Sequence, residues 1–442
     1  MSDSSSGSSA SRGILRDLLQ LVGRSRRPDL GHLAEALLSQ RGEASGVALA
    51  TEILAGYGEL DRAGRTAFLK TLAQKFGADR QRLERAINRY REQPSPQNGI
   101  ALHEAAEPRR QELIRRLNLA SGGTERLVRM REDLFDAMDG DPELATVDAD
   151  FRHLFSSWFN RGFLVLQRVD WHMPALVLEK IIRYEAVHEI SSWDDLRRRI
   201  DPEDRRCFAF FHPTLAGEPL IFVEVALTDD PPEAIAPLLA AERKTIPARK
   251  AKTAVFYSIS NCQLGLRGVP LGNFLIKQVV EELKRELPDL KAFVTLSPVP
   301  GFGPWLRRER DARSSTVLRG DDKDALKALD IGDWPRDASL VRKLRPVLSA
   351  AIAEYFLLAR SSGGKVIDPV ARFHLNNGAR LERINWLGDV SPKGLAQSAG
   401  FMVNYLYDPR RIEDNHEAFV NAGEVVASRA VRKLLRPAEK PA

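Results

Sequence analysis

The segment AVFYSISNCQLGLRGVPLGNFLIK, residues 254–277, decides the fold of the second half of this chain. It opens with an apolar run of strand type, Ala254–Ile259, which a glycine-containing loop follows. An amphipathic helix is predicted over Asn273–Leu287, and another strand-type run lies at Ala292–Leu296. Strand, loop, helix and strand in this order form a β-α-β unit, which indicates an α/β or α+β sheet.

The same mixture of elements begins earlier in the chain. Cys207–Phe211 and Leu220–Leu227 are also apolar runs of strand type, and Pro174–Tyr184 is a predicted helix. Before about residue 160 the apolar residues recur with the helical period, and β-branched alternation is almost absent. We therefore predict an α+β protein with an all-helical N-terminal domain and an α/β catalytic domain. The predicted parts are a disordered Ser-rich tail at 1–12, a helical domain at 13–160 and the catalytic domain at 161–442.

The composition is that of a globular protein of two or three domains. Hydrophobic residues make up 43% of the 442 residues and charged residues 29%. The net charge of +6 is small and diffuse, which suits an anionic small-molecule ligand. No polybasic block, zinc finger or RNA-binding signature is found, so we expect no nucleic-acid partner.

Cysteine, histidine and hydropathy patterns limit the function classes further. Cys207 and Cys262 are the only cysteines and do not have metal-ligand spacing, and the eight histidines show no H-E-x-x-H motif. We therefore expect a reducing compartment and no metal site. No apolar run reaches the roughly 18 residues of a membrane span, and the N-terminal tail has no apolar core of a signal peptide. These patterns favour a cytoplasmic protein without a membrane partner.

The loop that precedes the predicted helix has the features of an anion site. Free backbone N–H groups in a glycine-containing turn and the positive end of a helix both attract phosphate. The loop is similar to the pyrophosphate loop of GNAT acetyltransferases, although Pro270 stands where that pattern has glycine. The predicted loop residues are Arg267, Gly268, Val269, Pro270, Leu271, Gly272 and Asn273.

Several long motifs together resemble malonyl-CoA decarboxylases. They are FYSISNCQLGLRGVPLGNFLIK (256–277), TLSPVPGF (295–302), ARFHLNNGARLERINWLGDVSPKGL (371–395) and MVNYLYDP (402–409), with support from EAVHEI (185–190) and GEPLIFVEVAL (217–227). The resemblance covers about residues 160–430. It implies a GNAT-like catalytic domain, and a helical domain that joins copies of the chain into a homo-dimer or homo-tetramer.

The resemblance also implies an activity and a site. The reaction would convert malonyl-CoA to acetyl-CoA and carbon dioxide without a metal or organic cofactor. The catalytic serine of the family falls on Ser297 and the catalytic histidine on His374, and the CoA pyrophosphate loop falls on residues 267–273. An acidic residue of the family at the position of Pro270 would be missing here, so the resemblance does not extend to a carboxylate that orients the pair.

The chemistry explains why such residues are suitable. Decarboxylation leaves an enolate that must be stabilised and then protonated on carbon. Histidine titrates near neutral pH and is a natural proton donor, while a serine hydroxyl can hydrogen bond the histidine and the substrate carboxylate. Without the resemblance, Ser297 would be interpreted as the start of a turn and His374 as a buried structural histidine. We place Ser297 at a strand end before Pro298, and His374 at a strand or loop edge.

Other residues are weaker candidates. Ser258, Ser260 and Tyr405 are expected to line the pocket, with Tyr405 late on a helix. Backbone N–H groups at Tyr257–Ser260, or the side chains of Asn376 or Asn377, could hold the thioester oxygen. An acyl-CoA-dependent N-acyltransferase is the main alternative function, and a non-catalytic CoA-binding protein is another. The acyltransferase would need an amine acceptor, whereas a decarboxylase takes up a proton and needs none.

Overall fold

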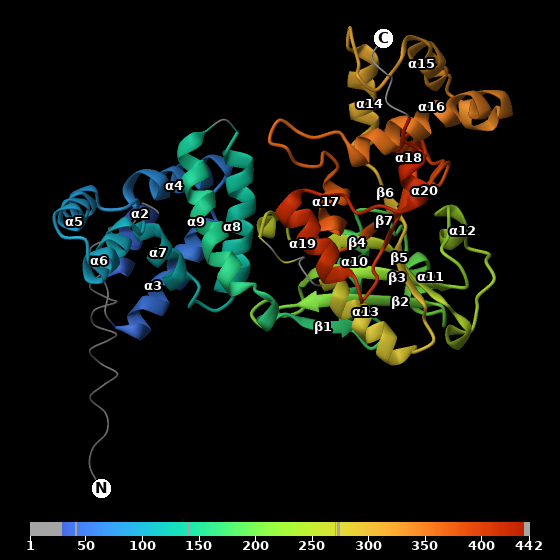
Figure 1. Cartoon of the computed structure of the whole chain (residues 1–442). Helices are drawn as coiled ribbons and strands as arrows, with labels where there is room; N and C mark the ends of the chain where they lie inside the picture. The colour runs from blue at the N-terminus through green and yellow to red at the C-terminus, as the bar shows by residue number, and fades with distance from the viewer. Residues whose placement is uncertain (1–28, 40–41, 140, 270, 272–274, 437–442) are drawn as a thin grey trace. The chain divides into compact units, whose positions relative to one another are not determined.

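The computed structural model describes residues 29–39, 42–139, 141–269, 271 and 275–436 (Figure 1). The predicted tail at 1–12 lies outside these residues. The chain divides into two compact units. The first comprises Met1–Asn160 together with Gln263–Val269, and the second comprises Arg161–Cys262 and Pro270–Ala442. A short piece between a strand and a helix of the second unit therefore packs with the helical residues.

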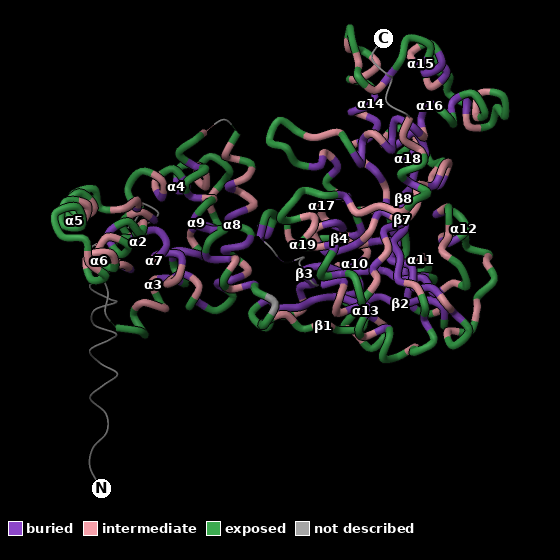
Figure 2. Tube along the Cα trace, in the orientation of Figure 1, coloured by how far each residue is buried: buried purple, intermediate pink, exposed green. Residues whose placement is uncertain are grey.

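The first unit is helical over its described residues, as predicted. Several helices begin where an Asp or Ser side chain accepts a hydrogen bond from a backbone N–H of the first turn, as at Asp61, Asp79, Ser95 and Asp141. The helices are α2 (Leu30–Ser39), α3 (Glu43–Gly58), α4 (Arg62–Lys75), α5 (Arg80–Glu92), α6 (Pro96–Ala106), α7 (Arg109–Leu117), α8 (Gly123–Ala137) and α9 (Pro142–Trp158). Apart from α5, each of these helices buries residues in the unit, whereas α5 buries none (Figure 2).

A single eight-stranded sheet organises the described part of the second unit. Its strands are β1 (Val165–Arg168), β2 (Arg205–Phe211), β3 (Pro219–Thr228), β4 (Thr253–Asn261), β5 (Ala292–Thr295), β6 (Ser297–Pro298), β7 (Arg380–Asn385) and β8 (Met402–Leu406). The strand order is β1-β2-β3-β4-β5-β8-β6, with β7 also paired to β8. Only β4 and β5 are parallel to each other, which confirms the predicted β-α-β unit, with α13 (Leu275–Glu286) as its helix.

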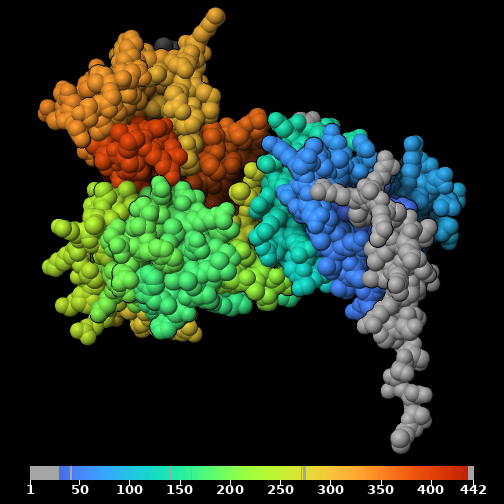
Figure 3. All heavy atoms as spheres, turned by 180° about the vertical axis from the view of Figure 1, so that it is seen from behind, coloured from blue at the N-terminus to red at the C-terminus, as the bar shows by residue number. Residues whose placement is uncertain are grey.

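Helices cover both faces of this sheet. α10 (Ala175–Tyr184) and α11 (Trp193–Ile200) bury their apolar residues against Cys207, Ala209 and Phe222 of the sheet. Figure 3 shows the outer side of this region as the green surface. Arg206 points to the opposite face, where its Nε donates to Glu286 Oε1 of α13 at 3.0 Å. The alternation of strand side chains explains why neighbouring residues reach different layers.

The remaining helices follow β6. They are α14 (Phe302–Asp311), α15 (Gly320–Leu326), α16 (Ala338–Leu357), α17 (Pro369–Asn376), α18 (Pro392–Ser398), α19 (Ile412–Ala422) and α20 (Arg429–Arg432), with α12 (Ala236–Leu239) between β3 and β4. Among the described helices, none combines the length and the apolar character that crossing a membrane requires.

Two local predictions are wrong. His374 does not lie at a strand or loop edge: it lies in the last turn of α17, which Asp368 caps and Pro369 begins. Gly378, at φ +77°, follows the end of that helix. Tyr405 is on strand β8 and not on a helix, because the helix after Ser391 ends at Ser398 and Gly400 turns the chain with φ +84°.

Candidate active site

A cavity of about 230 Å³ opens beside the carboxyl end of the parallel strand pair. Both predicted catalytic residues, Ser297 and His374, line it. The other lining residues are Val187, Phe256, Tyr257, Ile259, Asn261, Pro298, Pro369, Val370 and Phe373. The walls are therefore mostly apolar or aromatic, and the polar groups are few.

Different elements bring the predicted pair together. Ser297 lies two positions after the end of β5 and pairs with Val403 of β8 as part of β6. His374 projects from α17, 77 positions later in the chain, and Ser297 Oγ lies 3.0 Å from its Nε2. The side chain of His374 also stacks on the ring of Tyr405 at 4.5 Å between centroids. Both residues are nearly inaccessible, at 5% exposed for Ser297 and 2% for His374.

Four side chains form a continuous hydroxyl–imidazole chain of Tyr407, His374, Ser297 and Thr295. Tyr407 Oη lies 2.7 Å from His374 Nδ1, and Ser297 Oγ donates to Thr295 Oγ1 at 2.9 Å. Thr295 in turn donates to the carbonyl of Val403. Since the serine hydrogen is used on Thr295, Ser297 accepts from His374 Nε2–H. The Nδ1 atom is then the acceptor for Tyr407, which fixes the tautomer of the neutral ring.

Burial keeps this chain uncharged. Desolvation lowers the pKa of His374 to about 3, so the imidazole is neutral at physiological pH. Desolvation also raises the pKa of the Tyr407 hydroxyl well above its usual value. Neither group therefore carries a charge in the unliganded protein.

Asp368 holds the two parts of the site in register. It is fully buried, and its Oδ1 accepts from the N–H of Ala371 in the first turn of α17. Its Oδ2 accepts from the N–H of Gly301, which follows Ser297, and from the hydroxyl of Tyr355. A Cβ at Gly301 would lie 2.2 Å from the Tyr355 hydroxyl, so only glycine fits there. The serine loop and the histidine helix thus share one carboxylate.

Residues 185–190 supply a separate wall of the cavity, since Val187 lines it. Glu185 fixes the start of this segment. Its Oε1 accepts from the N–H groups of Val187 and His188, and its carboxylate accepts from the hydroxyls of Ser258 and Ser260. Ser258, predicted to line the pocket, is thus engaged with Glu185 and is not among the lining residues; Tyr405 contributes by stacking on His374 instead.

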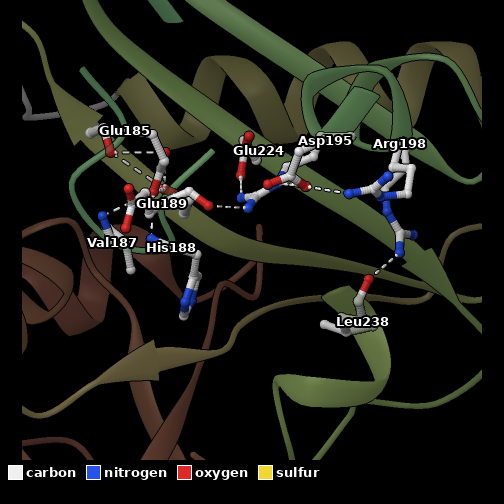
Figure 4. A network of polar contacts seen from close by, with 12 residues as sticks. Glu185, Val187, His188, Glu189, Asp195, Arg198, Glu224 and Leu238 are labelled. Carbon is white, nitrogen blue, oxygen red and sulfur yellow. Dashed lines mark hydrogen bonds and ion pairs between the residues drawn. The ribbon is translucent and has the colours of Figure 1, made fainter. Parts of the chain in front are cut away.

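Two cations secure the same segment, and Figure 4 shows the network to which it belongs. Arg199 Nη2 donates to the carbonyl of Glu189 at 2.9 Å, and its Nη1 donates to the fully buried Glu224 at 3.0 Å. Lys393 donates to the carbonyl of Val187 at 3.0 Å. We call Glu185, Arg199 and Glu224 the carboxylate–arginine network.

Glu224 is the member of this network with the least favourable environment for a charged carboxylate. Burial, followed by the nearby charge of Glu185, raises its pKa to about 8 despite Arg199. Its Oε1 is buried without a hydrogen-bond partner, whereas Glu185 accepts several. A proton taken up by the pair would therefore sit on Glu224.

Strand β4 is distorted where it borders the cavity. The register passes from Ser258 opposite Glu224 to Phe256 opposite Val225, so Tyr257 has no partner on β3. The pairing with β5 also stops at Phe256. Of the predicted alternatives for holding an oxyanion, this irregular strand lines the cavity. Asn377 does not line it, because its side-chain amide donates to the carbonyl of Phe373, and Asn376 is not a lining residue either.

The predicted anion loop is described only in part. Arg267, Gly268 and Val269 belong to the first unit, and Leu271 is buried in the second. Pro270, Gly272 and Asn273 lie outside the described residues. The arginine does not form an ion pair with a described residue; its guanidinium lies over the ring of Phe135 at 4.3 Å.

Sequence reasoning missed four residues of the site: Tyr407, Thr295, Asp368 and Glu185 as a hydrogen-bond centre. One of them, Asp368, had a signal. Asp368-Pro369 is a typical helix start, and it would have placed His374 on a helix. Thr295 and Tyr407 stand within quoted motifs, but nothing in their spacing predicts contact with Ser297 or His374.

Comparison with known proteins assigns the family. Residues 162–442 match the family described as the malonyl-CoA decarboxylase C-terminal domain, and residues 76–159 match its N-terminal domain. The crystal structure of malonyl-CoA decarboxylase from Rhodopseudomonas palustris is similar with 59% identity and a TM-score of 0.88, covering 91% of this chain and 98% of that chain. The crystal structure of malonyl-CoA decarboxylase from Agrobacterium vitis is also similar, with 56% identity and a TM-score of 0.89. The match covers 92% of this chain and 100% of that chain.

A curated relative agrees with these structures. The mitochondrial malonyl-CoA decarboxylase of Anser anser anser is 38% identical over 400 residues, which cover 83% of this chain and 79% of the goose protein. Both domain families match, in the same order as the two parts of the chain. The chain therefore belongs to the malonyl-CoA decarboxylase family.

Proposed function

We propose that this protein decarboxylates malonyl-CoA to acetyl-CoA and carbon dioxide, and that Ser297 and His374 act on the bound thioester without a metal or organic cofactor. The observation that carries the proposal is the hydrogen bond of 3.0 Å between Ser297 Oγ and His374 Nε2 at the cavity wall. Membership of the family supports the same substrate and reaction.

The polarity of the cavity favours loss of a carboxylate. None of the residues that line it, all in the described part of the chain, carries a Lys or Arg side chain. A malonyl carboxylate placed there would lose water without gaining a lysine or arginine partner, whereas carbon dioxide is neutral. The transition state spreads the negative charge toward the thioester, so the cavity stabilises it more than the ground state.

The bond between the carboxylate carbon and the α-carbon breaks and carbon dioxide leaves. The electron pair of that bond is delocalised into the thioester, which gives an enolate. The irregular backbone at Tyr257 is the proposed donor region for the enolate oxygen. The α-carbon then takes a proton, so one proton is consumed for each carbon dioxide released.

His374 is the proposed source of that proton. In the unliganded protein it is neutral, because burial lowers its pKa to about 3. An anionic malonyl group beside the ring raises this pKa, since a nearby negative charge favours imidazolium. Substrate binding would thus bring in one proton, which Ser297 and His374 deliver to the α-carbon after decarboxylation.

The CoA part of the substrate is proposed to bind at the loop of residues 267–273, as the family resemblance implies. We also propose that the helical unit joins copies of the chain, which analytical ultracentrifugation of the full chain would test. The predicted cytoplasmic location stays a prediction, and the curated relative from Anser anser anser is a mitochondrial protein.

The deciding experiment incubates chelator-treated protein with malonyl-CoA and no amine, and follows acetyl-CoA by mass spectrometry. Stoichiometric acetyl-CoA is the expected result, and it would also exclude a requirement for an added metal. Malonyl-CoA that stays intact alone but is consumed when an amine is added would replace the proposal with an N-acyltransferase.

A further inference from the structure

Thr295 is the last residue of strand β5 and is fully buried two positions before Ser297. Its hydroxyl has a complete set of hydrogen-bond partners. Thr295 Oγ1 accepts from the backbone N–H of Tyr405 at 3.1 Å and from Ser297 Oγ at 2.9 Å. It donates its own hydrogen to the carbonyl of Val403, at 3.4 Å. A hydroxyl can accept two hydrogen bonds and donate one, so no further partner can be added.

The neighbouring strand β8 fixes the position of this threonine. Asn404 Nδ2 donates to the carbonyl of Thr295 at 2.7 Å. Asn404 is itself held, because its Oδ1 accepts from Arg383 Nε at 3.0 Å and from Asn385 Nδ2 at 2.9 Å. Threonine is also restricted in χ1 by its branched Cβ. The acceptor for the Ser297 hydroxyl therefore stays in one place.

The opposite end of the hydroxyl–imidazole chain sets its direction. Within the described residues, the Tyr407 hydroxyl forms a hydrogen bond to no group besides His374 Nδ1, at 2.7 Å. If His374 carried its hydrogen on Nδ1, the buried Tyr407 hydroxyl would have no acceptor, which is unfavourable. Tyr407 therefore donates to Nδ1, and the hydrogen of the ring lies on Nε2 and is donated to Ser297. The Ser297 hydrogen then goes to Thr295, so every hydrogen of the chain has an acceptor.

This direction limits what Ser297 can do to a thioester. An attacking serine needs a base that takes its hydrogen while the bond to the acyl carbon forms. The Ser297 hydrogen lies toward Thr295 instead, and His374 Nε2 presents a hydrogen and not a lone pair, although Nε2 is only 3.0 Å from Ser297 Oγ. The same direction keeps a hydrogen on His374 Nε2, where protonation of the α-carbon can use it.

We propose that Thr295 is a positioning residue that determines the outcome of the reaction: it holds the hydroxyl hydrogen of Ser297 and so prevents His374 from activating this serine for hydrolysis of the CoA thioester. The observation that carries the proposal is the hydrogen bond of 2.9 Å from Ser297 Oγ to Thr295 Oγ1, in a chain whose direction Tyr407 fixes. The inference rests on the proposed function for the identity of the substrate.

The suppressed reaction would give different products. Ser297 Oγ would bond to the thioester carbonyl carbon while His374 took the serine proton, and the bond between that carbon and sulfur would break. The CoA thiolate would leave with the proton from His374, and water would then hydrolyse the serine ester. Malonyl-CoA and water would thus become malonate and CoA, without carbon dioxide or acetyl-CoA. The ratio of malonate to acetyl-CoA therefore reports on the direction of the hydroxyl–imidazole chain.

The test measures this ratio by mass spectrometry in wild type, Thr295→Val and the double variant Thr295→Val with Tyr407→Phe. Valine keeps the branched shape of threonine and removes the acceptor for Ser297. The double variant lacks both groups that set the direction, so the Ser297 hydrogen can turn to His374. We expect the ratio to rise about 10-fold in the double variant, on the scale of one lost hydrogen bond. Thr295→Val alone should give a smaller rise, and Thr295→Ser should match wild type because it keeps the hydroxyl.

Thr253→Val is the matched control. Thr253 is buried at the start of β4, but its hydroxyl donates to the carbonyl of Asp229, so its removal should leave the ratio unchanged. A double variant that is folded, as its melting temperature shows, and has the ratio of wild type overturns the proposal. Wild type that releases malonate as fast as acetyl-CoA also overturns it.

The ring nitrogens of His374 give a second test that needs no variant of Thr295. Nitrogen NMR of the isotope-labelled full protein, with the signal assigned by its absence in His374→Gln, shows which ring nitrogen carries the hydrogen. A hydrogen on Nε2 in the substrate-free protein is the expected result, and a hydrogen on Nδ1 overturns the proposal whether or not the variants fold. This measurement uses no substrate, so its outcome is separate from that of the proposed function, which fails if wild type forms no acetyl-CoA.

Discussion

Two buried polar systems border the same cavity, and they are built in opposite ways. In the hydroxyl–imidazole chain each side chain hydrogen bonds to the next one, and no member is charged. The carboxylate–arginine network is centred on the buried guanidinium of Arg199, and Glu224 Oε1 and Arg199 Nε are left without hydrogen bonds. The first system reaches the cavity through Ser297 and His374, whereas the second reaches it only through Val187, whose segment it fixes.

From this difference we infer that the hydroxyl–imidazole chain takes part in the reaction and that the carboxylate–arginine network holds the cavity wall in place. A neutral, fully paired chain can gain a proton and pass it on, because no fixed charge has to be overcome. A buried guanidinium is instead expensive to leave without its hydrogen-bond partner, because its charge then lies in a medium that solvates it poorly. We therefore expect substitutions in the hydroxyl–imidazole chain to lower turnover, and substitutions in the carboxylate–arginine network to lower stability.

The largest effect should follow from removing the groups that meet the substrate. Ser297→Ala and His374→Gln should each lower kcat about 10²–10⁴-fold, the usual range for a lost acid–base group. Steady-state kinetics with malonyl-CoA measures this, with the melting temperature recorded to confirm folding. His172→Gln, a change at a fully solvated histidine, is the control. Losses below ten-fold in both variants would refute the assignment of the pair.

The network should show the reverse pattern. Glu224→Ala should lower the free energy of unfolding by about 3–5 kcal/mol, because the buried Arg199 loses its partner at 3.0 Å and keeps only the longer pairing with Asp195 at 3.6 Å. Urea denaturation measures the loss, and kcat of the folded fraction should fall far less than in the His374 variant. The double variant Arg199→Met with Glu224→Leu should be more stable than the sum of the single changes predicts. A Glu224→Ala protein as stable as wild type would break the comparison.

A smaller effect on turnover is expected from a substitution of Tyr407, at the end of the hydroxyl–imidazole chain. Tyr407→Phe removes the donor to His374 Nδ1 and frees the ring to take its other tautomer, so kcat should fall about 10-fold with KM unchanged. Tyr405→Phe is the matched control, because its ring stacks on His374 and would still do so. Equal kinetic losses in the two variants would mean that packing, and not the hydrogen bond, sets the orientation of the imidazole.

The sequence predicts the element types and the hydrogen bond between Ser297 and His374 better than it predicts their surroundings. Continuous apolar runs identify β2 to β5, and the helical period identifies α13. Periodicity fails at Tyr405, where a short strand of five residues follows a helix, and at His374, whose helix has only eight residues. Short elements take their conformation from tertiary pairing and capping, which leave little trace in a periodic pattern.

Contacts between distant residues were beyond sequence reasoning for a different reason. Ser258 was expected to face the substrate, but its hydroxyl binds Glu185, 73 positions earlier. The distortion of β4 brings Ser258 opposite Glu224, on the side of the network. A shift of one residue in register moves a side chain to the other face of a sheet, so a motif alone cannot assign the face.

The smallest expected difference between the two systems is the direction in which the stability contributed by each changes with pH. His374 has a folded pKa of about 3, below its ordinary 6.5, so its contribution to stability is complete above pH 6.5 and is lost as pH falls toward 3. Glu224 has a folded pKa of about 8, above its ordinary 4.5, so its contribution is complete below pH 4.5 and is lost as pH rises through 8.

Each group changes the free energy of unfolding by at most about 1.4 kcal/mol per pH unit, so variants are needed to separate them. Urea denaturation of wild type, Glu224→Gln and His374→Gln across pH 4–8.5 measures both slopes. The advantage of wild type over Glu224→Gln should shrink as pH rises from 5 to 8, because only the native carboxyl keeps its proton there. The advantage over His374→Gln should grow from pH 4 to 6.5, since the unfolded histidine then loses the proton that the folded one never bound. If the stability advantage of wild type changed with pH in the same direction for both variants, His374 and Glu224 would not differ in the sign of their pKa shifts. The proposed contrast between the hydroxyl–imidazole chain and the carboxylate–arginine network would then be wrong.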